Sequence, residues 1–352
     1  MISVCMIVKN EEKNIEKSLK SIQKLGYEII VVDTGSTDKT KEIVKRYTDK
    51  LFNYKWCDDF SLARNFSVSK AKNKYIFILD ADEEIIQFDK NEIEETIINN
   101  ENKIGTIEVI NEYKRNGNSF KSISKVSRIF NKDKYKFKGE IHEQLVPLIG
   151  KKEEYHDLNI RINHSGYSEE EIKRKDKLNR NIRLLKKELL SKQEDPYILY
   201  QLGKTYYLME DYFQATNYFE KALSIDLDTK LYYVEDLVES YGYSLINSKR
   251  YEEALNLLGV YDEFKSYCDF IFLIGMIYMN NGYFKEAINE FTKALNYKEC
   301  KMVGVNSFLS TYNIGVIYEC LGEKELALYY YKKSNNYEKA KDRIKLLNEE
   351  RL

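Results

Sequence analysis

The sequence lacks an excess of charge, long apolar runs and paired cysteines, and each absence excludes a class of protein. Its 56 Lys and Arg residues nearly balance its 57 Asp and Glu residues, so the composition indicates neither nucleic acid nor an anionic membrane as a partner. No stretch approaches the roughly 20 apolar residues that span a bilayer. The apolar segment Ile2–Val8 is too short for a signal peptide and has no basic start, which is typical of a buried strand.

The cysteines exclude two further kinds of site. They are odd in number, scattered along the chain and never spaced as C-x-x-C, so neither a disulfide framework nor a zinc site is expected. The five are Cys5, Cys57, Cys268, Cys300 and Cys320. This pattern favours a reducing compartment, and we expect a cytoplasmic protein without a membrane span.

Residues 1–167 alternate apolar strands with helices. The strands are expected at residues 2–8, 28–32, 51–54 and 75–79, and the helices between them at residues 15–25, 39–47 and 61–71. Strands separated by helices of about ten residues indicate βαβ units, an α/β Rossmann-like fold and a mainly parallel sheet. Ligands of such sheets bind at the carboxyl ends of the strands.

The second half has no strand pattern. Residues 168–194 are expected to form an amphipathic linker helix whose Lys and Arg residues face solvent, and Asp195 and Pro196 are expected to begin the next helix. Residues 195–352 repeat a pattern in which a glycine precedes an alanine by twelve positions. The pairs are Gly203 and Ala215, Gly242 and Ala254, Gly275 and Ala287, and Gly315 and Ala327. They match the positions of tetratricopeptide (TPR) repeats, which implies an all-α superhelix with a concave binding face.

Two carboxylates directly follow the apolar strand at residues 75–79. Asp80 and Asp82 are two positions apart, so both can turn toward one point, and hard divalent cations prefer oxygen ligands. A diphosphate would supply further ligands, and the cation would stabilise it as a leaving group. The alternative is a solvated acidic loop, because Glu83 and Glu84 follow. An ATPase, which also ends a strand in acid, is disfavoured because the sequence has no P-loop.

Polar residues also close the first two strands. Asn10 and Glu11 follow the first, and the segment Asp33–Asp38 closes the second with a Gly-Ser-Thr turn suited to polar ligands. Together with the D-x-D sequence at Asp80, these residues resemble the family 2 glycosyltransferases, whose fold is called GT-A. The resemblance implies that Asp33 binds the uracil base and that Mn²⁺ or Mg²⁺ binds with UDP at the D-x-D. It also implies that transfer from a UDP-sugar inverts the configuration at the anomeric carbon of the sugar. The residues expected around the donor are Val8, Asn10, Glu11, Asp33, Gly35, Ser36, Arg64, Asp80, Ala81 and Arg128.

Four further segments narrow the resemblance. They are Phe60–Asn65, Arg128–Phe130, Phe137–Glu143 and His164–Tyr167. Their motifs, F-x-x-A-R-N, R-x-F, F-x-G-x-I-H-E and H-x-G-Y, together with a helical-repeat tail, resemble the glycocin peptide S-glycosyltransferases of the sublancin type. Bacterial glycan-core glucosyltransferases and flagellin glycosyltransferases share much of the same set.

The chain has only three histidines, and two lie in these motifs. An inverting transferase needs a base near the acceptor nucleophile, for which we predict Glu143, with His142 as the alternative. His164 is predicted to complete the cation's ligands with Asp80 and Asp82, although His142 would suit that role equally.

Three functions follow from these patterns. The first is transfer of a hexose or N-acetylhexosamine to a peptide or protein, on a Cys thiol or a Ser or Thr hydroxyl, with the acceptor bound partly by the TPR face. The second is the same transfer to a saccharide or lipid-linked acceptor in cell-surface glycan synthesis. The third, from another class, is a non-catalytic TPR scaffold. The resemblance also implies a homodimer, and no nucleic acid is expected as a partner.

Overall fold

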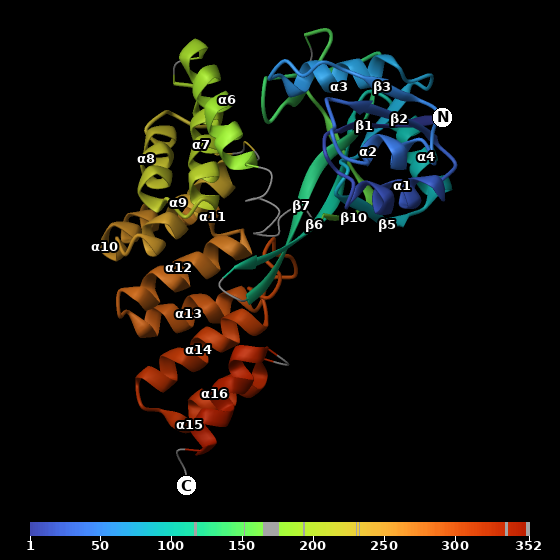
Figure 1. The fold of residues 1–352 in the computed structure, drawn as a ribbon. Helices are drawn as coiled ribbons and strands as arrows, with labels where there is room; N and C mark the ends of the chain where they lie inside the picture. The colour runs from blue at the N-terminus through green and yellow to red at the C-terminus, as the bar shows by residue number, and fades with distance from the viewer. Residues whose placement is uncertain are drawn as a thin grey trace. The chain divides into compact units, whose positions relative to one another are not determined.

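The chain is seen in a computed structural model that describes residues 1–352 except 116–117, 151, 165–175, 193, 230, 232, 335–336 and 350–352. The described residues form two compact units, residues 1–184 and 185–352 (Figure 1). The expected boundaries at residues 167 and 194 stay predictions. No helix in the described ranges is long and apolar enough to cross a membrane.

The first unit is built on an eight-stranded sheet in the order β3-β2-β1-β4-β7-β6-β10-β5, with a separate pair of strands, β8 and β9. The strands are β1 (Ile2–Val8), β2 (Glu28–Asp33), β3 (Leu51–Asn53), β4 (Tyr75–Ile78), β5 (Glu83–Phe88), β6 (Ile104–Arg115), β7 (Asn118–Asn131), β8 (Tyr135–Lys138), β9 (Gln144–Pro147) and β10 (Tyr155–His164). Four of the seven pairings in the large sheet are parallel, which confirms the predicted α/β fold with a mainly parallel sheet. The antiparallel pairings of β7 with β4 and β6, and of β5 with β10, were not predicted.

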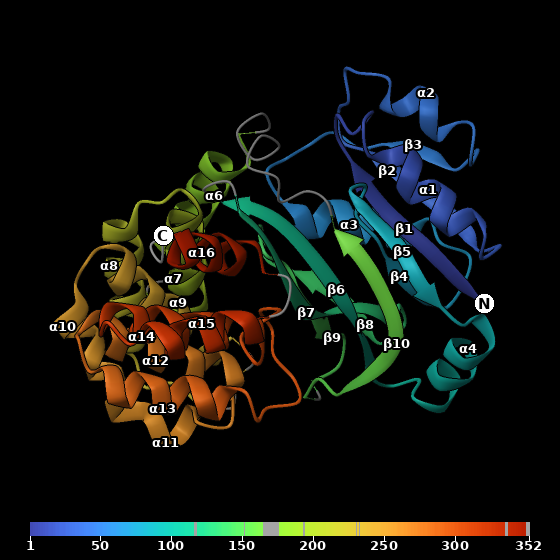
Figure 2. The same ribbon diagram turned by 90° about the horizontal axis from the view of Figure 1, so that it is seen from below.

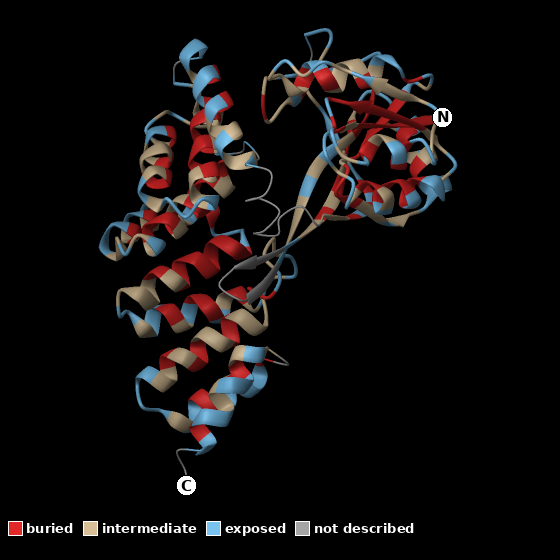
Figure 3. Ribbon diagram, in the orientation of Figure 1, coloured by how far each residue is buried: buried red, intermediate tan, exposed pale blue. Residues whose placement is uncertain are grey.

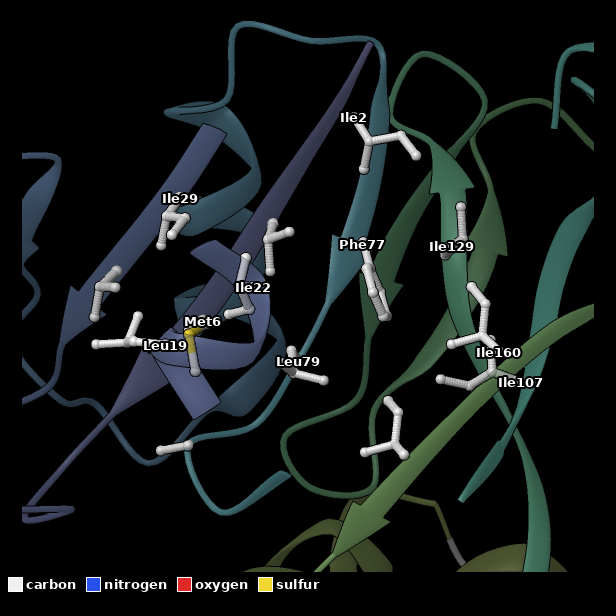
Figure 4. Close-up of a cluster of buried hydrophobic side chains, with 14 of the residues drawn as sticks. Ile2, Met6, Leu19, Ile22, Ile29, Phe77, Leu79, Ile107, Ile129 and Ile160 are labelled. Atoms are coloured by element: carbon white, nitrogen blue, oxygen red, sulfur yellow. The ribbon is translucent and has the colours of Figure 1, made fainter. Parts of the chain in front are cut away.

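Helices cover both faces of the sheet because the strands are apolar on both sides. The helices are α1 (Ile15–Gln23), α2 (Thr40–Val44), α3 (Phe60–Ser69) and α4 (Lys90–Asn99). Leu19 and Ile22 of α1 join Met6 and Phe77 in one core cluster (Figure 4). Cys5 faces the other side, in a second cluster with residues of β4, β7 and β8. The two clusters fix the sheet between layers. Because β1 pairs in parallel with both β2 and β4, the carboxyl ends of these three strands lie at one edge.

The second unit consists of helices paired into hairpins (Figure 2). They are α7 (Pro196–Leu208), α8 (Tyr212–Leu223), α9 (Val234–Asn247), α10 (Tyr251–Ala254), a 3₁₀ helix η1 (Leu255–Val260), α11 (Tyr261–Phe264), α12 (Cys268–Asn280), α13 (Phe284–Ala294), α14 (Phe308–Cys320), α15 (Lys324–Lys333) and α16 (Glu338–Glu349). Asp195 caps α7, accepting hydrogen bonds from the backbone N–H groups of Tyr197 and Ile198, and Pro196 begins the helix as predicted. Figure 3 shows buried residues concentrated along α12.

The linker helix is α6 (Lys177–Ser191), which contributes residues to both units. Of the range predicted for it, residues 168–175 and 193 lie outside the described residues.

In three of the four hairpins the repeated small residues lie where the two helices cross, as predicted, whereas a Cβ added to Gly242 would lie nearest Leu273 of α12. All four alanines are fully buried. A Cβ added to Gly203 would lie 2.4 Å from the ring of Phe219, and at Gly275 and Gly315 it would lie 2.7 Å from the rings of Phe291 and Tyr331. Each of these three glycines therefore lets an aromatic ring of the second helix reach the backbone of the first.

We expect Gly203→Ala to destabilise the second unit by about 1–3 kcal/mol, because the methyl group overlaps the Phe219 ring. Gly259→Ala is the matched control, since no atom lies within 4 Å of its added Cβ. Urea unfolding followed by helical circular dichroism measures both. Equal midpoints for the two variants would contradict the packing role of Gly203.

Candidate functional site

The turn after β4 carries the two predicted acids. The backbone N–H of Asp80 donates to the Glu83 carboxylate at 2.9 Å, and the N–H of Glu83 donates to the Asp80 carbonyl at 3.2 Å. Ser18 of α1 donates to the same carbonyl at 3.3 Å. Glu83 is only 2% exposed, so this segment is not a solvated acidic loop. Ala81, between the acids, is also buried.

Two guanidinium groups bind the carboxylate of Asp80. Arg64 of α3 donates to Oδ1 at 3.0 Å, and Arg128 of β7 donates to Oδ2 at 3.1 Å and to Glu83 at 2.5 Å. Burial acts to raise the pKa of Asp80, but the two guanidiniums outweigh it and lower that pKa. Arg64 Nη1 and Arg128 Nε are buried and have no hydrogen-bond partner among the described residues. These two N–H groups are suited to an anion.

Arg64 also binds the predicted base. Its Nε donates to Oε1 of Glu143, so one guanidinium joins Glu143 to Asp80. The ring of Phe137 lies 5.8 Å from the Arg64 guanidinium carbon. The sequence predicted these residues as parts of one site, and the structure brings them together.

The segment that carries Glu143 is fixed to α3 by hydrogen bonds. Asn65 donates to the carbonyl of Phe137 at 2.9 Å and accepts from its N–H at 3.0 Å. The N–H of Phe60 donates to the carbonyl of Glu140 at 2.8 Å. Gly139 has a φ of +113°, a backbone conformation that L side chains rarely adopt. Two motifs that are about 75 residues apart along the chain therefore form one local structure.

His142 lies beside Glu143 in a different environment. Its Nε2 is buried and has no hydrogen-bond partner among the described residues, and its backbone φ is +50°. Burial lowers the pKa of His142, while Glu143 acts in the opposite direction. The imidazole is therefore neutral at pH 7, which leaves one ring nitrogen able to accept a proton.

Asp82 faces His164 rather than the arginines. The distance from Asp82 Oδ2 to His164 Nε2 is 3.5 Å. His164, the last residue of β10, lies opposite Glu83 of β5 in the antiparallel pairing, which brings the end of β10 to the D-x-D turn. Burial lowers the pKa of His164, but the hydrogen bond to Asp82 outweighs it and raises that pKa.

A neighbouring amide orients the imidazole of His164. Asn111 of β6 donates its Nδ2 to Ser124 at 3.0 Å, and its Oδ1 lies 2.9 Å from His164 Nδ1. The Nδ1–H therefore donates to Asn111, and Nε2 faces Asp82. Histidines that bind metals are oriented in the same way, so Asp82 and His164 fit as two ligands of a divalent cation.

The third predicted ligand, Asp80, is engaged by the two arginines. In the described part of the chain, no three His, Cys, Asp or Glu side chains form a group that would hold a metal ion. A diphosphate and water would have to supply the other ligands, and the metal site stays a prediction.

The loops after β1 and β2 are bound to each other. Asp33, 2% exposed, accepts hydrogen bonds from the N–H groups of Gly35 and Ser36 at 3.1 Å each. The N–H of Asn10 donates to Ser36 Oγ at 2.9 Å, and Asn10 Oδ1 accepts from the N–H of Thr37 at 2.8 Å.

Two further hydrogen bonds extend this contact. Thr34 donates its N–H to the carbonyl of Val8 at 2.9 Å, and Glu11 donates its N–H to Thr40 at 2.7 Å. The structure therefore brings together the predicted residues at the ends of these two strands. Gly35 has a φ of +112° and open space where a Cβ would lie.

The first turns of α6 also reach this site. Lys177 Nζ lies 3.6 Å from Asp82 Oδ2, and the Arg180 guanidinium lies 5.1 Å from the centre of the Phe60 ring. The expectation that basic residues of this helix face solvent is wrong for these two. The sequence offered no local signal for Lys177 or Asn111, because each acts through a partner far away in the chain.

We expect Asn65→Ala to destabilise the first unit by about 1–3 kcal/mol, because it leaves the N–H and carbonyl of Phe137 without their partner. It should also lower any activity that needs Glu143 in place. Asn53→Ala, at an exposed position of β3, is the control. Urea midpoints within experimental error of each other would contradict this role for Asn65.

Models of two known families match parts of the chain. Residues 3–142 match the family model described as glycosyl transferase family 2. Residues 196–228 and 269–299 each match a tetratricopeptide repeat model. These matches confirm the two predicted resemblances.

Two curated proteins and one solved structure are similar to parts of the chain. The SPbeta prophage-derived glycosyltransferase SunS of Bacillus subtilis (strain 168) is 30% identical over 228 residues, which are 63% of this chain and 53% of SunS. A TPR repeat-containing protein of Synechococcus elongatus is 30% identical over 220 residues, 57% of this chain and 51% of its own. The chain thus spans about half the length of these curated relatives. The crystal structure of MamA is 23% identical, with a TM-score of 0.40, over 49% of this chain and 95% of MamA.

Proposed function

We propose that this chain, whose residues 3–142 match the model of glycosyl transferase family 2 and are followed by matches to tetratricopeptide repeats, transfers a sugar from a UDP-sugar to a peptide or protein. One observation carries the proposal. A carboxylate–imidazole pair, two guanidiniums with unused N–H groups and a further carboxylate meet at the carboxyl end of β4. A sugar diphosphate needs these groups: ligands for a cation, donors for phosphate oxygens and a base for the acceptor.

The donor would lie along the ends of β2, β1 and β4. Asp33 supplies a buried carboxylate for the imide N–H of uracil, beside the turn at Gly35 and Ser36. Arg64 Nη1 and Arg128 Nε supply two N–H groups for phosphate oxygens. Because both guanidiniums are already fixed by Asp80, they need little reorganisation to bind the diphosphate.

Asp82 and His164 would hold the cation. One oxygen and one nitrogen ligand suit Mn²⁺ better than Mg²⁺, which prefers oxygen ligands alone. When bound, the cation would neutralise charge on the departing diphosphate. Asn111 and Asp82 already orient His164 in the structure.

The transfer is a single displacement. The acceptor sulfur or oxygen forms a bond to the anomeric carbon, the bond from that carbon to the UDP oxygen breaks, and UDP leaves with the electron pair. The acceptor proton passes to Glu143, and the anomeric configuration inverts. Arg64 positions Glu143 within the same hydrogen-bonded group as Asp80. His142, neutral and adjacent, is the alternative proton acceptor.

The repeats favour a polypeptide acceptor over a saccharide or lipid-linked one, because TPR hairpins stack into concave surfaces that bind extended or helical segments. A cysteine acceptor needs the least help from Glu143, since a free thiol has a pKa of about 8.5. The sugar, a homodimer and a cytoplasmic location stay predictions.

The first test is UDP release from a panel of UDP-sugars, with Mn²⁺, Mg²⁺ or EDTA. We expect cation-dependent hydrolysis of one donor, with at least about a 100-fold loss in Asp82→Ala. Glu84→Gln is the matched control, because Glu84, two positions further in β5, pairs instead with Lys17 of α1. Neither turnover nor cation-dependent UDP binding in the unaltered protein would contradict the proposal and favour a non-catalytic scaffold.

We expect Glu143→Gln to keep UDP affinity and to lower kcat by about 10²–10⁴-fold, because glutamine still accepts from Arg64 but cannot take the acceptor proton. His142→Ala should have the smaller effect. If His142 were the base, its lowered pKa would make the rate fall with decreasing pH only below 6.5, as the imidazole takes up a proton. If Glu143→Gln kept near-normal turnover and its rate fell with decreasing pH below 6.5, the base would be His142.

A further inference from the structure

The most informative group outside the predicted site is Lys177, at the start of α6. Its ammonium lies 3.6 Å from Asp82 Oδ2, the same oxygen that lies 3.5 Å from His164 Nε2. An imidazole and an ammonium thus share the oxygen that is proposed to bind the metal ion. The Asp82 side chain is 9% exposed and that of Lys177 is 28% exposed, so solvent screens this pair only partly.

We infer that Lys177 occupies the cation's place at Asp82 when the donor is absent, and turns to the donor diphosphate when the cation binds. This inference rests on the proposed function. It adds a residue of α6 to the donor site, and it makes one ammonium group take part in both cation and donor binding.

The start of α6 is fixed to the first unit by two neighbouring side chains. Arg183 donates to both carboxylate oxygens of Asp58, at 2.8 and 3.1 Å, and Arg180 lies over the Phe60 ring. Lys177, Arg180 and Arg183 are three positions apart in turn, so they lie along one side of the helix. The base of the Lys177 side chain is therefore held near the D-x-D turn.

The partners of these arginines are themselves ordered. Trp56 donates its indole N–H to Asp58 at 2.8 Å, and its ring centre lies 4.7 Å from that of Phe60. With its base fixed, only the four-carbon stem of Lys177 has to move for its ammonium to exchange one anion for another.

Electrostatic repulsion and attraction would move the ammonium of Lys177 from Asp82 to the diphosphate. In the absence of a cation, the ammonium of Lys177 compensates the charge of the buried Asp82. A divalent cation at Asp82 and His164 repels the nearby ammonium, which must find another anion. The diphosphate that completes the cation's ligands brings that anion to the same place. Lys177 therefore competes with the cation alone but assists the donor once the cation is bound.

The test is to measure the two affinities separately in Lys177→Met, which keeps the stem and removes the charge. Free Mn²⁺, followed by its electron paramagnetic resonance signal, gives the Kd of Mn²⁺ without nucleotide. Calorimetry at saturating Mn²⁺ gives the Kd of UDP. We expect the Mn²⁺ Kd to fall about threefold and the UDP Kd to rise about tenfold.

Two variants serve as controls. Lys177→Arg keeps the charge and should leave both constants within about twofold of the unaltered protein. Lys74→Ala removes an exposed ion pair with Glu101 elsewhere in the same unit, and should change neither constant. A general loss of folding would weaken both ligands together, so opposite changes cannot arise from it.

The outcomes separate the two proposals. Opposite changes in Lys177→Met support the inference. If the unaltered protein binds Mn²⁺ and UDP but Lys177→Met changes neither constant, or shifts both in one direction, the inference is overturned and the proposed function stands. If the unaltered protein binds neither ligand, the proposed function fails and the inference fails with it.

Discussion

The arrangement of the site depends on the guanidinium group of Arg64. It is 11% exposed, and burying such a charge is unfavourable unless carboxylates compensate it. Asp80 and Glu143 provide this compensation from two places that are far apart in the chain. Because Arg64 stays buried only while both carboxylates face it, the D-x-D turn and the segment after β8 are held in a fixed relation. The helix that carries Arg64 is fixed in turn, since Asp59 caps its start and Ala63 is fully buried.

The carboxylates that compensate the two arginines do not accept hydrogen bonds from all of their N–H groups. Asp80, Glu83 and Glu143 bind some of the N–H groups of the two arginines, while one buried N–H on each has no partner among the described residues. A buried donor without an acceptor destabilises the protein until a ligand supplies one. The site therefore gives up some stability of the ligand-free protein in exchange for a preformed place for an anion.

Much of the fold could be predicted because its signals are local. Apolar runs predicted the strands β1 and β4, and a capping aspartate predicted the start of α7. The spacing between glycine and alanine predicted the helical hairpins. The candidate site was predicted as a set of residues but not as a set of contacts. Nothing near Asp80 in sequence shows that it binds two arginines while Asp82, two positions later, faces a histidine. Such a division is decided by side chains that are 16 to 82 positions away, which only the folded chain brings close.

The pairing of β10 with its two neighbouring strands explains why that division arises. Strands β1 to β4 form the parallel half, which supplies Asp33, Asp80 and the loops around them. β10 is inserted between β6 and β5, so its last residue, His164, lies opposite Glu83 at the start of β5. Asn111 of β6 occupies the position beside His164 on the other flank of β10, and orients the ring. A one-residue shift in either pairing would turn His164 to the opposite face of the sheet. The register of β10 therefore decides whether Asp82 has an imidazole partner, and through it whether the D-x-D turn can offer both an oxygen and a nitrogen to a cation.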